Sequence, residues 1–183
     1  ATKIARFCDL LTSNKAIKDF PGAENGLQHK GRAKVRKVGC AVDAGAKVFE
    51  MAAKRGIDFL IVHHGMRWPT ISPLREVRKL RVDTLKRTGL SLYSSHLPLD
   101  AHPIIGNNAL IAADLGLRVV DWFVDFEGLP IACICQGIPR STLARRLKQS
   151  YPGTYQAIEF GSARPKKIDI LSGSGRSALD HLR

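Results

Sequence analysis

Residues 58–65 read Asp-Phe-Leu-Ile-Val-His-His-Gly, a short apolar run that ends in two adjacent histidines and a glycine. Four consecutive apolar residues between polar ones are typical of a strand that is buried on both faces, as strands of parallel sheets are. The run therefore predicts a central strand over 58–62, with His63 and His64 at its carboxyl end.

Outward from this strand, short apolar strands alternate with amphipathic helices, which is typical of βαβ units and a largely parallel sheet. In the first block we expect strands at 38–42, 58–62 and 90–94, helices at 4–11, 43–55, 72–88 and 107–115, and a loop at 21–31. Asp43 is expected to cap the helix that follows it. In the second block we expect strands at 118–120, 129–135, 156–160 and 167–171, a helix at 141–150, and the start of another at 176. The pattern predicts an α/β fold with two modules, 1–120 and 121–183, the first of which carries His63 and His64.

The strand at 90–94 is also followed by polar residues, among them His96 and Asp100, and Pro98 argues against a regular helix there. Carboxyl ends of neighbouring parallel strands lie at one edge of a sheet, so these side chains are expected to meet His63 and His64. Imidazole and carboxylate are ligands of zinc, iron and manganese.

Adjacent side chains on extended backbone point to opposite sides, which suits His63 and His64 to two ions better than to one. A carboxylate has two oxygens, so Asp100 can bridge two ions. The alternative is one buried, hydrogen-bonded histidine beside a polar turn.

The charge balance favours an anionic partner. The 183 residues contain 29 Lys and Arg against 16 Asp and Glu, a formal charge of +13. Such a surplus suits nucleic acid, nucleotides or other phosphorylated molecules, although a solvated basic surface accounts for it equally well. The same alternatives hold for the basic helix at 72–88, where solvent exposure is the default interpretation and nucleic-acid contact the second.

Composition and cysteine spacing indicate in which compartment the protein is expected. Hydrophobic residues make up 44% of the chain, and its apolar runs are far shorter than the roughly 18 residues that a membrane span needs. The cysteines, at positions 8, 40, 133 and 135, form no C-x-x-C pair. We therefore expect reduced thiols in a cytoplasmic protein.

Several motifs of the sequence resemble those of a known family and occur in the same order. They are Asn25-Gly26-Leu27-Gln28, Val35-Arg36-Lys37-Val38, Ile61-Val62-His63-His64-Gly65, His96-Leu97-Pro98-Leu99-Asp100-Ala101-His102-Pro103 and Gly106-Asn107-Asn108-Ala109. With them the chain resembles the GTP cyclohydrolase I type 2 homologue family, the NIF-three-like dinuclear-metal proteins, and its bacterial members in particular. The match runs along most of the chain and is strongest over residues 25–116.

The resemblance implies two intertwined α/β modules, a toroidal homo-hexamer and two divalent metal ions (zinc, iron or manganese) that face the central cavity. The family's first two histidine ligands fall on His63 and His64, its bridging aspartate falls on Asp100, and His96 lies beside the site. The family also uses a His and a Glu one helical turn apart near its C-terminus, and this sequence has no match for that pair. We therefore expect the second module to be incomplete at its C-terminus and the natural protein to continue beyond Arg183.

Three functions follow as hypotheses, the third of which is metal storage or chaperoning, with loose, exchangeable ions and no turnover. In the first, the protein is a metal-dependent hydrolase of a small anionic substrate, nucleotide-like or phosphorylated, with His63, His64 and Asp100 as ligands and His96 as proton carrier or water-orienting group. In the second, it is a non-enzymatic, ring-shaped scaffold that binds nucleic acid or a regulatory protein. Steep loss of affinity with salt, unaffected by chelation of the metals, would favour the second.

Overall fold

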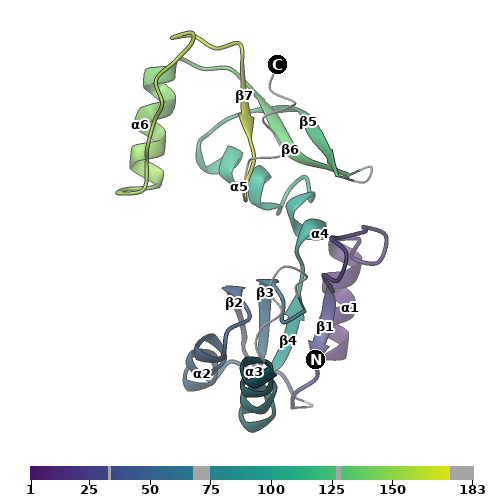
Figure 1. Cartoon of the computed structure of the whole chain (residues 1–183). Coiled ribbons are helices and arrows are strands. Elements are labelled where there is room, and N and C mark those ends of the chain that lie inside the picture. The colour runs from purple at the N-terminus through teal and green to yellow at the C-terminus, as the bar shows by residue number, and fades with distance from the viewer. Residues whose placement is uncertain (33, 68–74, 127–128, 174–183) are drawn as a thin grey trace. The chain divides into compact units, whose positions relative to one another are not determined.

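The protein was studied as a computed structural model, which describes all residues except 33, 68–74, 127–128 and 174–183 (Figure 1). Its internal contacts divide the chain into two compact units, Ala1–Leu99 and Asp100–Arg183, and each is described by itself. The modules 1–120 and 121–183 remain predictions. Within the described residues, no helix combines the length and the apolar composition that a bilayer crossing requires.

The first unit is built on a four-stranded sheet of order β1-β4-β3-β2. Its strands are β1 (Gly26–His29), β2 (Val38–Asp43), β3 (Phe59–His64) and β4 (Ser91–Ser94). β2, β3 and β4 run parallel, which confirms the three predicted strands and the mostly parallel sheet. The loop expected over 21–31 is wrong in part, because β1 pairs antiparallel with β4 at the edge of the sheet. The Pro21-Gly22 and Asn25-Gly26 dipeptides, which are typical of turns, led to the loop prediction.

Helices cover both faces of this sheet, which explains the unbroken apolar run of β3. On one face, Leu60 and Val62 pack with Phe49 of α2 (Ala46–Lys54) and Leu85 of α3 (Arg75–Thr88). On the other, Phe59 packs with Tyr93 and with Ala5 of α1 (Thr2–Leu11). Alternate residues of β3 thus point into two different cores, as the sequence predicted. The expected start of α3, at 72–73, lies outside the described residues.

Two local predictions in this unit are wrong. Gly45, not Asp43, occupies the N-cap position of α2, and Asp43 instead ends β2. Residues 97–100 form a single helical turn, α4 (Leu97–Asp100), although Pro98 was expected to prevent it. Pro98 is the second residue of that turn, where a backbone N–H has no partner within the helix, so its missing N–H costs nothing.

The second unit has a different sheet. It contains α5 (Asn107–Asp114), β5 (Val119–Phe126), β6 (Leu129–Gln136), α6 (Arg140–Ser150) and β7 (Lys167–Ile170). The strands are antiparallel in the order β5-β6-β7, so the prediction of parallel strands holds only for the first unit. Cys133, Cys135 and Ile170 form its core with Ala112 and Leu115 of the α5 region.

One predicted strand of this unit is absent. Residues 156–160 have no strand pairing, and the side chains of Ile158 and Phe160 are 98% and 92% exposed. Their alternation with polar residues mimics a half-buried strand, but no strand among the described residues pairs with them. The helix expected from 176 lies outside the described residues.

Candidate metal centre

Three histidines meet at the carboxyl edge of the parallel strands. His63 and His64 are the last residues of β3, and His96 follows β4 by two residues. The two strands are hydrogen-bonded neighbours in parallel register, with Val62 opposite Ser94. One ring nitrogen of each histidine lies within 4.8 Å of the others, so this predicted juxtaposition is confirmed and the group could hold a metal ion.

The rings of His63 and His64 are held from opposite sides. The Nδ1 of His63 donates to the backbone carbonyl oxygen of Ser95, beyond β4, at 3.1 Å. The Nδ1 of His64 donates to Oδ1 of Asp43, at the end of β2, at 2.8 Å. The two ring centroids are nevertheless only 4.7 Å apart. Whether these residues bind two ions rather than one remains a prediction.

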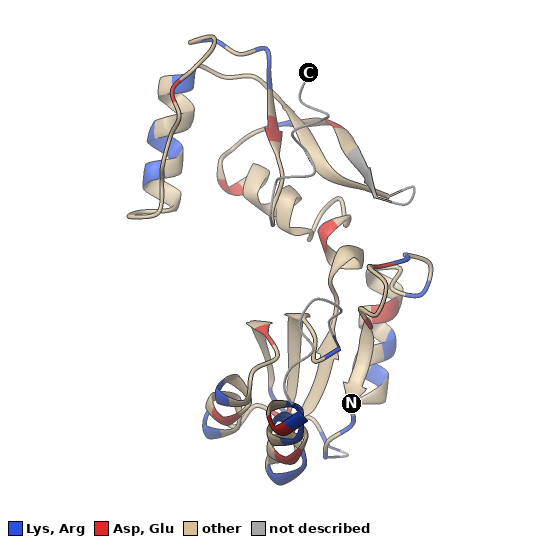
Figure 2. Ribbon diagram, in the orientation of Figure 1, with Lys and Arg blue, Asp and Glu red and all other residues tan. Residues whose placement is uncertain are grey.

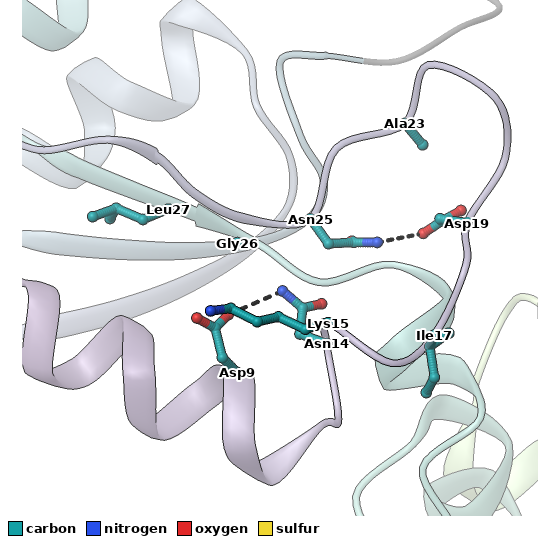
Figure 3. A pocket seen from close by; sticks show the side chains of 9 residues that line it. All are labelled: Asp9, Asn14, Lys15, Ile17, Asp19, Ala23, Asn25, Gly26 and Leu27. Atoms are coloured by element: carbon teal, nitrogen blue, oxygen red, sulfur yellow. Dashed lines mark hydrogen bonds between the residues drawn. The ribbon is translucent and has the colours of Figure 1, made fainter.

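The ring of His96 is held by a buried carboxylate. Its Nδ1 lies 2.9 Å from Oδ1 of Asp19, and the two side chains are 10% and 4% exposed. The second oxygen of Asp19 accepts hydrogen bonds from Nδ2 of Asn25 and from the backbone N–H of Leu97. Figure 3 shows the Asp19–Asn25 bond in the wall of a pocket of about 420 Å³. The backbone N–H of His96 in turn donates to Asn25.

Asp19 is ionised under ordinary conditions. Burial raises the pKa of its carboxyl, but the hydrogen bonds from His96 and Asn25 and the attraction of His96 outweigh burial and leave the pKa below its ordinary value.

These contacts fix the tautomer of all three rings. A carbonyl oxygen and a carboxylate can only accept, so each Nδ1 carries a proton and each neutral ring has its lone pair on Nε2. Metal-binding histidines usually have this arrangement, in which an acceptor holds one nitrogen and the other ligates. Three imidazoles of fixed tautomer form a donor set suited to zinc, iron or another transition metal.

The remaining predicted site residue, Asp100, begins the second unit. It ends α4, is 8% exposed, and accepts a hydrogen bond from Nδ2 of Asn107 at 2.6 Å. Its role as a bridging ligand remains a prediction. The nearby His102 has a structural contact, because its Nδ1 accepts the backbone N–H groups of Ile104 and Ile105, both at 3.2 Å.

Sequence reasoning missed the acceptors behind the histidines. Asp43 had a local signal for a different role, since an aspartate before a helix is typical of a cap. Asn25 belongs to one of the family motifs, but nothing in that motif indicates its contact with His96. Asp19 lies in a loop with no pattern that points to a site 77 positions away.

Fold and site together define an α/β protein with a candidate metal centre at the carboxyl edge of its parallel strands. The chain belongs to the Duf34/NIF3 (NGG1p interacting factor 3) family, whose model matches residues 3–183. The family expected from the motifs is therefore confirmed.

Individual relatives agree with this assignment. A protein of Archaeoglobus fulgidus named GTP cyclohydrolase 1 type 2 homolog is 35% identical over 178 residues, which are 97% of this chain and 71% of that protein. A protein of the same name from Pyrococcus horikoshii is 35% identical and covers 97% of this chain and 72% of its own. Among solved structures, TTHA1606 of Thermus thermophilus has a TM-score of 0.82 and 34% identity, over 100% of this chain and 74% of its own. The protein ybgI, of unknown function, has a TM-score of 0.84 and 31% identity, over 98% and 72%.

Proposed function

We propose that this protein is a metal-dependent hydrolase of a small anionic molecule, phosphorylated or nucleotide-like. The observation that carries the proposal is the trio of His63, His64 and His96, whose Nδ1 atoms are all bound to acceptors. The names of the relatives support a nucleotide-like substrate class.

His63 and His64 are the proposed ligands, through Nε2, with Asp100 as a carboxylate that bridges two ions. Divalent ions would supply Lewis-acid chemistry, which lowers the pKa of water and attracts the anionic oxygens of a phosphate. The excess of positive charge on the chain favours the approach of such a substrate.

His96 is proposed to accept and return a proton at Nε2. Its partner Asp19 is ionised and buried, so it stabilises the ring when protonated and keeps it in one orientation. The role differs from that of a ligand in a testable way, because a proton carrier can be replaced without loss of the metal.

Assembly is proposed on the family resemblance alone. Six copies would form a ring, with the metal sites facing its cavity. Sedimentation of the full-length protein at micromolar concentration should give a species of six chains, and a monomer would contradict the proposal.

The test measures metal content and turnover in the same preparations. Full-length wild type, His63→Ala, His64→Ala, His96→Gln and His29→Gln are dialysed against a weak chelator, assayed for metal, and incubated with a panel of nucleotides and phosphate esters. His29 serves as a matched control, because it lies in β1 and its Nδ1 contacts the carbonyl oxygen of Leu90.

We expect the two alanine variants to lose part of their metal and to lose turnover. His96→Gln should retain metal but lose about 10²- to 10⁴-fold in rate, the usual contribution of a positioned acid or base. His29→Gln should behave as wild type. Absence of metal from wild type after reconstitution, or turnover that survives its removal, would contradict the proposal.

A further inference from the structure

The positive charge of the chain is concentrated in its first unit. Residues 1–99 contain 19 Lys and Arg against 8 Asp and Glu, a net charge of +11. Residues 100–183 contain 10 against 8, a net charge of +2. A solvated surface alone gives no reason for this difference between two units of similar size.

Within the first unit, nine exposed cations belong to three segments that meet at one edge of the sheet. We call them the basic edge: Lys30, Arg32, Lys34, Arg36, Lys37, Lys54, Arg55, Lys86 and Arg87. Five of them lie in residues 30–37, between β1 and β2, a stretch without any acidic residue. The others end α2 and α3, and Figure 2 shows the blue Lys and Arg segments on these two helices.

The start of residues 30–37 is fixed against the end of α3. The backbone N–H of Gly31 donates to Oγ of Ser91 at 3.0 Å, and that of Arg32 donates to the carbonyl oxygen of Gly89 at 3.0 Å. The contact is so close that a Cβ on Gly31 would lie 2.1 Å from this oxygen. Only glycine fits there.

The other end of the segment is fixed against β3 and α2. Asp58, immediately before β3, accepts the backbone N–H groups of Arg36 at 2.9 Å and Lys37 at 3.1 Å. The Nζ of Lys37 donates to the carbonyl oxygen of Arg55 at 2.9 Å. The basic edge is therefore ordered by backbone contacts and lies at the amino ends of the parallel strands. The histidines lie at the opposite ends, roughly 20 Å away along β3.

The acidic residues around this edge leave its charge largely uncompensated. Glu50 pairs with Arg87 at 3.1 Å, and the carboxylate of Asp58 is bound to backbone N–H groups. Asp83 is exposed on α3. Against nine cations, these three carboxylates leave a surplus of six positive charges.

The spacing of the cations suits a regular array of anions. Lys30, Arg32, Lys34 and Arg36 occur at every second position, and the described residues between them, Gly31 and Val35, are partly buried. Residues two positions apart are separated by at most about 7 Å along the chain, so the cations recur at short intervals. A nucleic-acid duplex carries one negative charge per about 1.7 Å of its axis, so several phosphates fall within reach of this row.

We propose that the basic edge binds the phosphate backbone of double-stranded nucleic acid. Lys and Arg contacts to phosphate carry no sequence information, so binding is independent of sequence. Residues 30–37 contain no aromatic residue on which an unpaired base could stack, which favours the duplex over a single strand. The surface is remote from the histidines, and binding does not depend on the proposed hydrolase.

The experiment measures fluorescence anisotropy of a labelled 20-base-pair DNA of mixed sequence, titrated with the full chain from 50 to 200 mM KCl. The edge variant is Arg32→Gln, Lys34→Gln, Arg36→Gln. The matched control is Arg145→Gln, Arg164→Gln, Lys166→Gln. It also replaces two exposed Arg and one exposed Lys, but in the second unit. Thermal unfolding checks that both variants retain the wild-type fold. Parallel titrations use the single strand, anionic phosphatidylserine vesicles, and the duplex with EDTA.

For wild type, log affinity should fall linearly with log salt. The edge variant should reduce that slope by about 2.7, since each lost phosphate contact removes about 0.9, and should weaken binding more than tenfold at 50 mM KCl. The control should keep the wild-type slope, and EDTA should have no effect. Equal losses in both variants, no binding of duplex, or tighter binding of single strand or vesicles than of duplex would each overturn the proposal.

Discussion

His96 donates through Nδ1 to Oδ1 of Asp19 at 2.9 Å, across 77 positions of sequence, and both side chains are almost entirely buried. This pair connects a loop after α1 to the residue that follows β4, and it fixes which nitrogen of His96 faces the other two histidines. The geometry of the site therefore depends on a residue outside every motif of the sequence.

Asp19→Asn should lower the free energy of unfolding more than Asp43→Asn does. Asparagine has one acceptor oxygen, so the variant places an N–H₂ group against buried donors and should lose about 1–3 kcal/mol of unfolding free energy. Asp19→Asn should retain its metal, because its partner His96 is the proposed proton carrier and not a ligand. Asp43 is 69% exposed, and water can replace its contact with His64, so its variant should lose little stability. Urea unfolding and metal titration of both variants measure the difference, and equal losses of stability would contradict this account.

Asp100→Asn should empty the metal site more completely than either His63→Ala or His64→Ala. Two divalent ions a few ångströms apart repel each other, and only a negative group between them offsets the repulsion. Metal per chain, measured by elemental analysis after dialysis, should be near zero for Asp100→Asn and intermediate for the histidine variants. Wild-type stoichiometry in Asp100→Asn would show that this carboxylate does not bridge.

Acid should destabilise the first unit through Asp58. Hydrogen bonds from the backbone of Arg36 and Lys37 lower the pKa of its carboxyl below the ordinary value. A lowered pKa in the folded state means that the stabilisation is present above the ordinary pKa, about 3.8, and is lost as the pH falls below it. The unfolding midpoint of wild type should thus fall more steeply from pH 6 to pH 3 than that of Asp58→Asn. As a control, Asp83→Asn on the exposed face of α3 should keep the wild-type slope.

Of the four cysteines, Cys40 should react first with a thiol reagent. It is exposed, whereas burial raises the pKa of Cys8 and Cys135 and raises the pKa of Cys133 to about 12. The thiolate is the reactive form, so at pH 8 the native protein should release about one equivalent rapidly with Ellman's reagent. Unfolding in guanidinium should release four. Rapid release of three or more from the native protein would contradict the core packing around Cys133 and Cys135, because only Cys8 and Cys40 have exposed surface.

The central strands and the histidine group could be predicted because their signals are local. The apolar run of β3 indicates burial on both faces. The residues at the end of such a strand lie at the carboxyl edge of the sheet. Its neighbour β4 obeys the same rule. His63, His64 and His96 were therefore predicted to meet from the ends of two strands alone.

The rest depends on contacts between distant residues. The edge strand Gly26–His29 exists because β4 is available to pair with it, and residues 156–160 form no strand because no other described segment pairs with them. Asp43 had two possible roles, as a cap and as an acceptor for His64, and only the register of β2 against β3 decides between them. Asp19 carried no signal at all.

The most direct test of the account is a crystal structure of the metal-loaded full-length protein, with anomalous data at the iron, zinc and manganese edges. We expect an anomalous peak at coordination distance, about 2.0–2.2 Å, from Nε2 of His63 and His64, with Asp19 still bound to Nδ1 of His96. A metal-loaded crystal without a peak at these histidines, or with the ion ligated through Nδ1, would contradict it.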